Sequence, residues 1–162
     1  AKERFIRNFA ALPERIRCRI TLENDDKTFN ATETLEICET VGVPMVLDLH
    51  HHEVNPSGKT AEELWPRIAK TWEDFAGTPA LPPKIHFSNP KSQEAVRSHA
   101  DDVDPAQLLP FLRAIASATP HLDIMLEAKR KDAALFQLMK DVAPMPGITV
   151  IDQASFAVSP RR

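Results

Sequence analysis

The strongest constraint on the fold is a fourfold alternation of short apolar runs with longer amphipathic stretches. The apolar runs occupy residues 17–25, 42–52, 82–88 and 121–129. The amphipathic stretches that follow them occupy residues 31–41, 61–75, 105–118 and 131–142. Short apolar runs predict strands, and apolar residues spaced three or four apart predict helices. Strands that alternate with helices build a parallel sheet, so the sequence predicts the α/β class.

Two of the predicted helices carry a recognisable start. Thr60 precedes the stretch at 61–75 and is a suitable N-cap. Asp104 precedes Pro105, which combines a strong N-cap with proline at the first helical position. These residues fix where two of the helices begin.

Polar and apolar side chains alternate within the predicted strands. In residues 84–87, Lys84 and His86 point to one face, opposite two apolar side chains. An open sheet covered by helices on both faces has nearly continuous apolar strands, whereas here one face carries charge. This pattern favours a (β/α) TIM barrel, whose active site lies at the C-terminal ends of the strands. A complete barrel has about 250 residues, so four βα units predict a half barrel.

We expect residues 1–162 to form a single domain, the C-terminal half of such a barrel. The chain begins without Met, and its first apolar residues have helical spacing. Residues 1–15 are therefore predicted to be the end of a preceding helix of a longer chain, and residues 155–162 a tail. A half barrel has two unpaired edge strands. We expect a missing N-terminal half-barrel, or self-association, to cover them.

Composition excludes several classes of protein. A content of 43% hydrophobic and 27% charged residues is ordinary for a soluble globular protein. There is no signal peptide and no apolar run of about 18 residues, so we expect a cytoplasmic protein that does not contact membranes. Cys18 and Cys38 lack a C-x-x-C spacing and are predicted to be buried in a reducing compartment.

Charge limits how the chain could bind DNA. The net charge is -3, and basic residues cluster only at 129–131 and 161–162. A general electrostatic footprint for nucleic acid is therefore absent from the sequence. If the partner is DNA, metal ions and local lysines and arginines must supply the attraction.

Carboxylates and imidazoles lie at or just after the C-terminal end of every predicted strand. They are Glu23; Asp48 with His50, His51 and His52; His86 preceded by Lys84; His99; and Glu127 followed by Lys129. The C-terminal ends of parallel strands meet at one rim, so we expect one site. Mixed carboxylate and imidazole ligands suit Mn²⁺, Zn²⁺ or Fe²⁺ better than Mg²⁺ or Ca²⁺. For each residue taken alone, an ion pair, a cap or a core hydrogen bond is the alternative.

Four segments at these positions resemble a known family. They are LENDDKTF (22–29), PMVLDLHHHEVNP (44–56), KIHFS (84–88) and SHADDV (98–103). They are similar to the C-terminal half of the bacterial UV damage endonucleases, relatives of endonuclease IV among the xylose-isomerase-like TIM barrels. The resemblance implies a DNA repair enzyme that binds UV-damaged double-stranded DNA. Such an enzyme hydrolyses the phosphodiester on the 5′ side of cyclobutane pyrimidine dimers and 6-4 photoproducts.

The resemblance also implies the roles of individual residues. The implied metal ligands are Glu23, Asp48, His51, His86, His99 and Glu127, with Mn²⁺ the expected ion, Zn²⁺ the alternative, and two or three sites in the full barrel. Glu23 would bridge two metals, and Glu23, Glu127 and Lys84 are the implied catalytic residues. Lys84 would lie close to the metals as a candidate for carboxylation. Together with Lys129, it would neutralise phosphate charge.

The choice among the three histidines differs between two arguments. Strand alternation alone selects His50, two residues after Asp48. The D-x-x-H spacing of the family selects His51, which requires the strand to end at about His50 and turn. His50 and His52 are then expected to be neighbours that hydrogen-bond ligands or phosphate.

Two other functions fit the same residues. A xylose-isomerase-like sugar isomerase or epimerase would use one divalent metal, with Glu23 and Glu127 moving a proton. Alternatively, the chain is a non-catalytic fragment, since the first half of the family, with its further histidine ligands, has no counterpart here. The chain contains no Tyr, and Trp65 and Trp72 are predicted on helix faces rather than as stacking platforms for bases. The activity of this chain alone is therefore left open.

Overall fold

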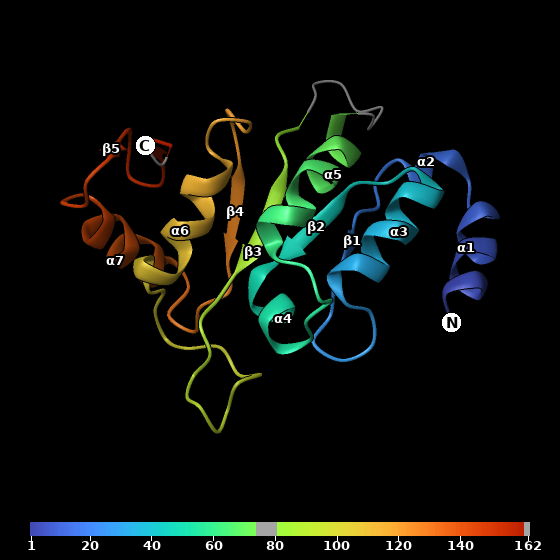
Figure 1. Ribbon diagram of the computed structural model, residues 1–162, viewed down its shortest axis with the longest axis horizontal. Coiled ribbons are helices and arrows are strands. Elements are labelled where there is room, and N and C mark those ends of the chain that lie inside the picture. Colours follow the sequence, from blue (N-terminus) through green and yellow to red (C-terminus); the bar gives the residue numbers. More distant parts are fainter. Residues whose placement is uncertain (74–80, 161–162) are drawn as a thin grey trace. The chain divides into compact units, whose positions relative to one another are not determined.

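The computed structural model describes residues 1–73 and 81–160, and its elements alternate as the sequence predicts (Figure 1). In chain order they are α1 (Lys2–Ala10), α2 (Glu14–Arg17), β1 (Leu22–Glu23), α3 (Ala31–Val41), β2 (Met45–Asp48), α4 (Leu49–Val54), α5 (Ala61–Glu73), β3 (Lys84–Phe87), α6 (Pro105–Ile115), β4 (Asp123–Leu126), α7 (Asp132–Val142), β5 (Ile148–Val150) and β6 (Phe156–Val158). The strands β1, β2, β3 and β4 form a sheet in that order. The α/β class with a parallel sheet is confirmed. Within residues 1–73 and 81–160 the sheet does not close into a barrel.

The chain divides into two compact units. The first comprises Ala1–Ile85 with His121–Asp123, and the second comprises His86–Pro120 with Ile124–Arg162. Each unit contains its own buried apolar side chains.

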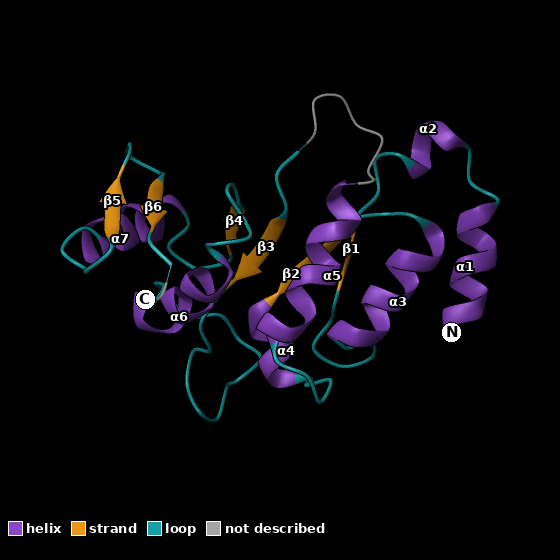
Figure 2. Cartoon of the chain, turned by 45° about the horizontal axis from the view of Figure 1, so that its top comes forward, coloured by secondary structure: helices purple, strands orange, loops and turns teal. Residues whose placement is uncertain are grey.

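In the first unit, helices α3 and α5 cover β2 (Figure 2). The side chains of Leu35, Met45, Leu47 and Ile68 are each 0% exposed. Fully burying side chains of this size stabilises a fold by about 1.5–3 kcal/mol each. The first unit thus has a core that holds β2 firmly between its neighbours.

Hydrogen bonds from α5 fix the amino end of β2. The backbone N–H of Met45 donates to Thr71 Oγ1 at 3.0 Å, and the indole of Trp72 donates to the carbonyl of Met45 at 2.7 Å. Trp65 and Trp72 are both buried, as expected for residues of a helix face. Their rings are core side chains, not platforms for bases.

The helix starts follow the capping residues of the sequence. Thr60 and Asp104 cap α5 and α6 as predicted, with Thr60 Oγ1 accepting from the Glu63 N–H at 3.2 Å and Asp104 Oδ1 from the Ala106 N–H at 2.9 Å. Asn30 adds a capping box at the start of α3. Gly42 ends that helix at φ 70, a left-handed conformation that glycine adopts without steric cost.

In the second unit, α6 packs against α7. Leu108, Leu138 and Val142 are buried there. The backbone N–H of Glu127 donates to the carbonyl of Phe87 at 3.0 Å, which extends the pairing of β4 with β3. Carbonyl and amide thus align the polypeptide after β4 with the end of β3.

The predicted alternation of side chains in β3 is confirmed. Ile85 and Phe87 are buried, whereas Lys84 and His86 are half-buried. The same alternation runs through β4. Starting with Asp123, every second residue of the strand is exposed, and the residues between are half-buried. One face of these strands is therefore the polar face that the sequence indicates.

The segment before β1 differs from the prediction. Only Leu22–Glu23 of the run at 17–25 is a strand. Residues before it satisfy their backbone groups in local turns, with Cys18 N–H donating to Glu14 O at 3.0 Å. Cys18 is therefore exposed, and its predicted burial is wrong; Cys38 is buried as predicted.

Further along the chain, β5 pairs with β6 in an antiparallel hairpin that the sequence did not reveal (Figure 2). β6 falls within residues 155–162, the expected tail. The end of the predicted helix at 61–75 and the basic pair at 161–162 lie outside the described residues. Among the described helices, none combines the length and the apolar character that crossing a membrane requires.

The two thiols should differ in reactivity. Burial raises the pKa of Cys38 to about 12, so this thiol stays protonated where an ordinary thiol, with a pKa of about 8.5, ionises. We expect iodoacetamide to alkylate Cys18 and to spare Cys38 in the native chain, as measured by peptide mass spectrometry. Both should react in denaturant, which serves as the control. Equal labelling in the native chain would contradict the structure.

Candidate functional site

The first candidate site forms where β2 passes into α4. The strand ends at Asp48 and the helix begins at Leu49, two residues earlier than the expected end near His50. Asp48 is the N-cap of α4, and its Oδ1 accepts from the backbone N–H of His51 at 2.7 Å. An N-cap side chain accepts from the N–H three residues further along the chain, which is the spacing of D-x-x-H. This spacing places the side chains of Asp48 and His51 together.

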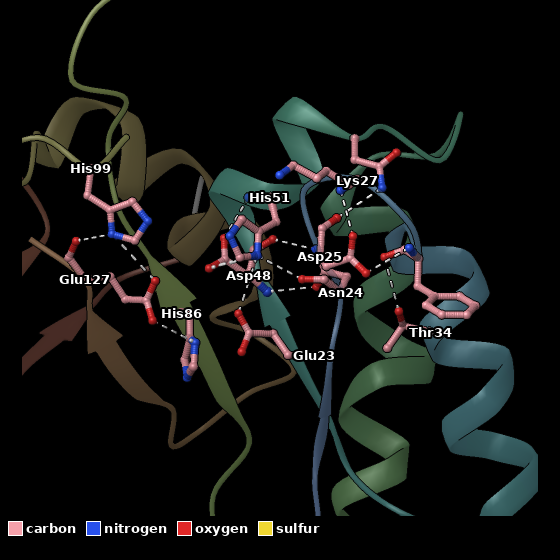
Figure 3. A network of polar contacts seen from close by, with 12 residues as sticks. Glu23, Asn24, Asp25, Lys27, Thr34, Asp48, His51, His86, His99 and Glu127 are labelled. Carbon is pink, nitrogen blue, oxygen red and sulfur yellow. Dashed lines mark hydrogen bonds and ion pairs between the residues drawn. The ribbon is translucent and has the colours of Figure 1, made fainter. Parts of the chain in front are cut away.

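Glu23 joins these two residues from the end of β1 (Figure 3). His51 Nδ1 lies 3.5 Å from Glu23 Oε1 and 3.6 Å from Asp48 Oδ2. One ligand atom from each of the three residues lies within 4.8 Å of the others. We call Glu23, Asp48 and His51 the first cluster. Its two carboxylates and one imidazole are a donor set that fits Mn²⁺ or Zn²⁺.

Asn24 connects the parts of the first cluster. Its side chain donates to the backbone carbonyl of Asp48 and accepts from the backbone N–H of Asp48, both at 2.9 Å. Its own backbone carbonyl lies 2.9 Å from His51 Nδ1. A carbonyl only accepts hydrogen bonds, so Nδ1 carries the proton and Nε2 keeps a lone pair for a metal.

Asp25 shapes the loop that follows β1. Its Oδ1 accepts from the backbone N–H groups of Lys27, at 2.7 Å, and of Thr28, and its Oδ2 accepts from that of Phe29 at 3.0 Å. Burial raises the pKa of Asp25, but these N–H groups and the nearby His51 outweigh burial and hold the pKa below its ordinary value. The loop is therefore built around an ionised carboxylate.

Sequence reasoning missed Asn24 and Asp25 as parts of the site. Both lie in the LENDD segment, and Asn and Asp after a strand are typical of turns that bond side chain to backbone. That signal could have identified Asp25. It could not have shown which backbone groups Asn24 holds, because these lie 24 residues away in the chain.

The second unit contains a cluster of its own (Figure 3). Glu127 Oε1 lies 3.4 Å from His86 Nδ1, and Glu127 Oε2 lies 3.8 Å from His99 Nδ1. His99 Nδ1 also lies 2.6 Å from the backbone carbonyl of Glu127. His99 therefore has the same tautomer as His51, with Nε2 able to bind a metal. We call His86, His99 and Glu127 the second cluster.

The loop that carries His99 is fixed by Asn89. The carbonyl of Asn89 accepts from the N–H of Ala100 at 2.8 Å, and its side chain accepts from the N–H of Asp104 at 2.7 Å. Asn89 is 6% exposed. Buried amide groups of this kind cost free energy unless they are bonded, so they hold the loop in one conformation.

The remaining candidate residues lie outside the two clusters. His50 and His52 are buried residues of α4. Lys84 is the half-buried first residue of β3. Lys129 is exposed, and its N–H donates to the carbonyl of Ala100 at 3.0 Å. The side chains of His50 and His52 are therefore less exposed than that of the half-buried His51.

Comparison with known proteins identifies relatives of this chain. A family model described as UV-endonuclease UvdE matches residues 1–158. A UV DNA damage endonuclease of Bacillus pumilus (strain SAFR-032) is 45% identical over 148 residues, which are 91% of this chain and 45% of the relative. One of Halalkalibacterium halodurans is 43% identical over 159 residues, which are 98% of this chain and 48% of the relative.

A solved structure also matches the fold. The crystal structure of SacUVDE superposes with a TM-score of 0.72 at 29% sequence identity, covering 87% of this chain and 46% of that one. The chain spans about half the length of the curated relatives it matches. The similarity to these proteins therefore concerns only the half of each that matches this chain.

Proposed function

The chain belongs to the UV-endonuclease UvdE family, and from this premise we propose that it serves in a metal-dependent DNA repair endonuclease. Its substrate would be double-stranded DNA with UV photoproducts, cut by phosphodiester hydrolysis on the 5′ side of cyclobutane pyrimidine dimers and 6-4 photoproducts. The observation that carries the proposal is the match over residues 1–158 to the family. Carboxylate and imidazole clusters within that span support it.

We propose that the residues of both clusters bind divalent metal ions: Glu23, Asp48 and His51 in the first, His86, His99 and Glu127 in the second. Metal ions in such nucleases supply a hydroxide at neutral pH and stabilise charge on the phosphate and the leaving oxygen. Mn²⁺ is the expected ion and Zn²⁺ the alternative. The geometry supports this, because backbone carbonyls lie within hydrogen-bond distance of Nδ1 of His51 and of His99, which favours the tautomer with a lone pair on Nε2.

We assign the remaining chemistry to three side chains. Glu23 and Glu127 would balance metal charge and hold the ions against the reacting phosphate. Lys84 precedes His86 by two residues on the polar face of β3 and would neutralise phosphate charge, with carboxylation as the alternative state. Exposed Lys129, two residues beyond Glu127, would contact the DNA backbone.

We propose that residues 1–162 form one domain, the C-terminal half of a xylose-isomerase-like TIM barrel. The parallel sheet and the coverage of 46% of the SacUVDE chain support a half barrel. The other half would come from an N-terminal half-barrel or from a second copy that pairs with the edge strands. The site of action would be the cytoplasm, at the DNA of the nucleoid.

Metal binding can be tested on the chain itself. We expect Glu23→Gln in the first cluster and His86→Ala in the second each to lower Mn²⁺ affinity by at least about tenfold, because each removes a ligand. Titration calorimetry measures the affinity. Glu53→Gln and His121→Ala, which change exposed residues outside the clusters, are the matched controls. Unchanged affinity in the cluster variants would overturn the ligand assignment.

Nuclease activity is tested with supercoiled plasmid and Mn²⁺. We expect UV-irradiated plasmid to be nicked and unirradiated plasmid to stay intact, because the photoproduct selects the site. A second protein, in which residues of this chain replace the matching segment of the Halalkalibacterium halodurans relative, tests the chain in a full-length context. Irradiated plasmid left intact by both proteins would contradict the proposal. Isomerisation of sugars without nicking would favour the isomerase alternative.

A further inference from the structure

The side chain of Asn24 takes the place of one backbone hydrogen bond between β1 and β2. In this parallel pair, Leu22 lies opposite Met45 and Glu23 opposite Val46, and the Leu22 N–H donates to the Pro44 carbonyl at 3.1 Å. Continued in this register, the ladder would direct the N–H of Asp48 to the backbone carbonyl of Asn24. The N–H of Asp48 donates instead to Asn24 Oδ1 at 2.9 Å.

The amide of Asn24 holds both backbone groups of Asp48. Its Nδ2 donates to the Asp48 carbonyl at 2.9 Å, so a single side chain satisfies one donor and one acceptor. Asn24 is 1% exposed and Asp48 is 0% exposed. Water cannot easily substitute for such buried partners, so losing the amide would remove two hydrogen bonds that hold the backbone of Asp48. The position of the Asp48 carboxylate thus depends on Asn24.

Because Asn24 Oδ1 accepts the hydrogen bond from Asp48, the backbone carbonyl of Asn24 can accept from another donor. That donor is His51 Nδ1, at 2.9 Å. The bond fixes the Nδ1–H tautomer and the orientation of the ring, and leaves the lone pair on Nε2. A hydrogen bond to the second nitrogen of a ligand histidine also raises its basicity toward the metal.

We propose that Asn24 is a positioning residue of the first cluster. Its side chain takes the place of its own carbonyl in the β1–β2 ladder, so that this carbonyl can hold His51 with Nε2 presented to a divalent cation. Asn24 acts on two ligands at once, on Asp48 through the amide and on His51 through the carbonyl. The inference rests on the proposed metal function of the first cluster and deepens it.

The opposite end of β2 supplies a structural comparison. There, Thr71 and Trp72 hold the two backbone groups of Met45, much as Asn24 holds those of Asp48. Met45 carries no metal ligand. Loss of a bond at this end should lower stability without affecting the first cluster, which makes Thr71→Val a matched control.

The first experiment compares Mn²⁺ binding of wild type, Asn24→Ala and Thr71→Val by titration calorimetry, with thermal unfolding measured in parallel. We expect Asn24→Ala to bind about tenfold more weakly, within the range known for residues that orient metal ligands, and Thr71→Val to bind like wild type. Equal affinity of wild type and a folded Asn24→Ala would overturn the inference. Absence of binding in wild type would contradict the proposed function instead.

The second experiment reads the tautomer directly, and its wild-type arm does not depend on any variant. Long-range ¹⁵N–¹H correlation spectra of metal-free wild type, at a pH where imidazole is neutral, report the tautomer of His51. We expect the Nδ1–H form in wild type and a mixture of both forms in Asn24→Ala, because the backbone carbonyl then returns to the ladder. A merely structural role of Asn24 would leave the tautomer unchanged. An Nε2–H tautomer in wild type would overturn the inference whatever the binding data show.

Discussion

The first cluster depends on how the backbone of Asp48 is held where β2 becomes α4. At this junction the chain leaves the ladder, and the buried backbone groups of Asp48 must be hydrogen-bonded. The side-chain amide of Asn24 bonds both the N–H and the carbonyl of Asp48 at 2.9 Å. The helix can then begin at once, with the Asp48 carboxylate as its N-cap and His51 in its first turn.

The two units solve the same chemical problem in a similar way. A ligand histidine needs its proton on one nitrogen and its lone pair on the other, and neutral imidazole chooses between two tautomers. In each cluster a backbone carbonyl makes that choice: Asn24 for His51, and Glu127 for His99. Backbone carbonyls at strand ends are rigid acceptors, so they orient a ring without adding a charge that would compete for the metal.

Much of the fold follows from sequence periodicity. The helix at 31–41 has the predicted bounds, and Thr60 and Asp104 start their helices where the capping rules place them. These features are local, since they depend on neighbours within one or two turns. The alternation in β3 is equally local and is confirmed.

Other features depend on distant partners and were mispredicted or missed. The buried residues of β2 continue through His50 into α4. An apolar run in the sequence therefore does not show that the strand ends at Asp48 and that a helix follows. Cys18 alternates like a strand residue but lies in a local turn. The ligands were predicted from strand ends and family resemblance, whereas the role of Asn24 appears only when β1 and β2 are paired.

The most direct test of this account is anomalous diffraction at the manganese edge from crystals of the chain grown with Mn²⁺. We predict a peak within coordination distance of carboxylate oxygens of Glu23 and Asp48 and of His51 Nε2, with His51 Nδ1 still bonded to the carbonyl of Asn24. A peak away from these three residues, or coordination through His51 Nδ1, would contradict it.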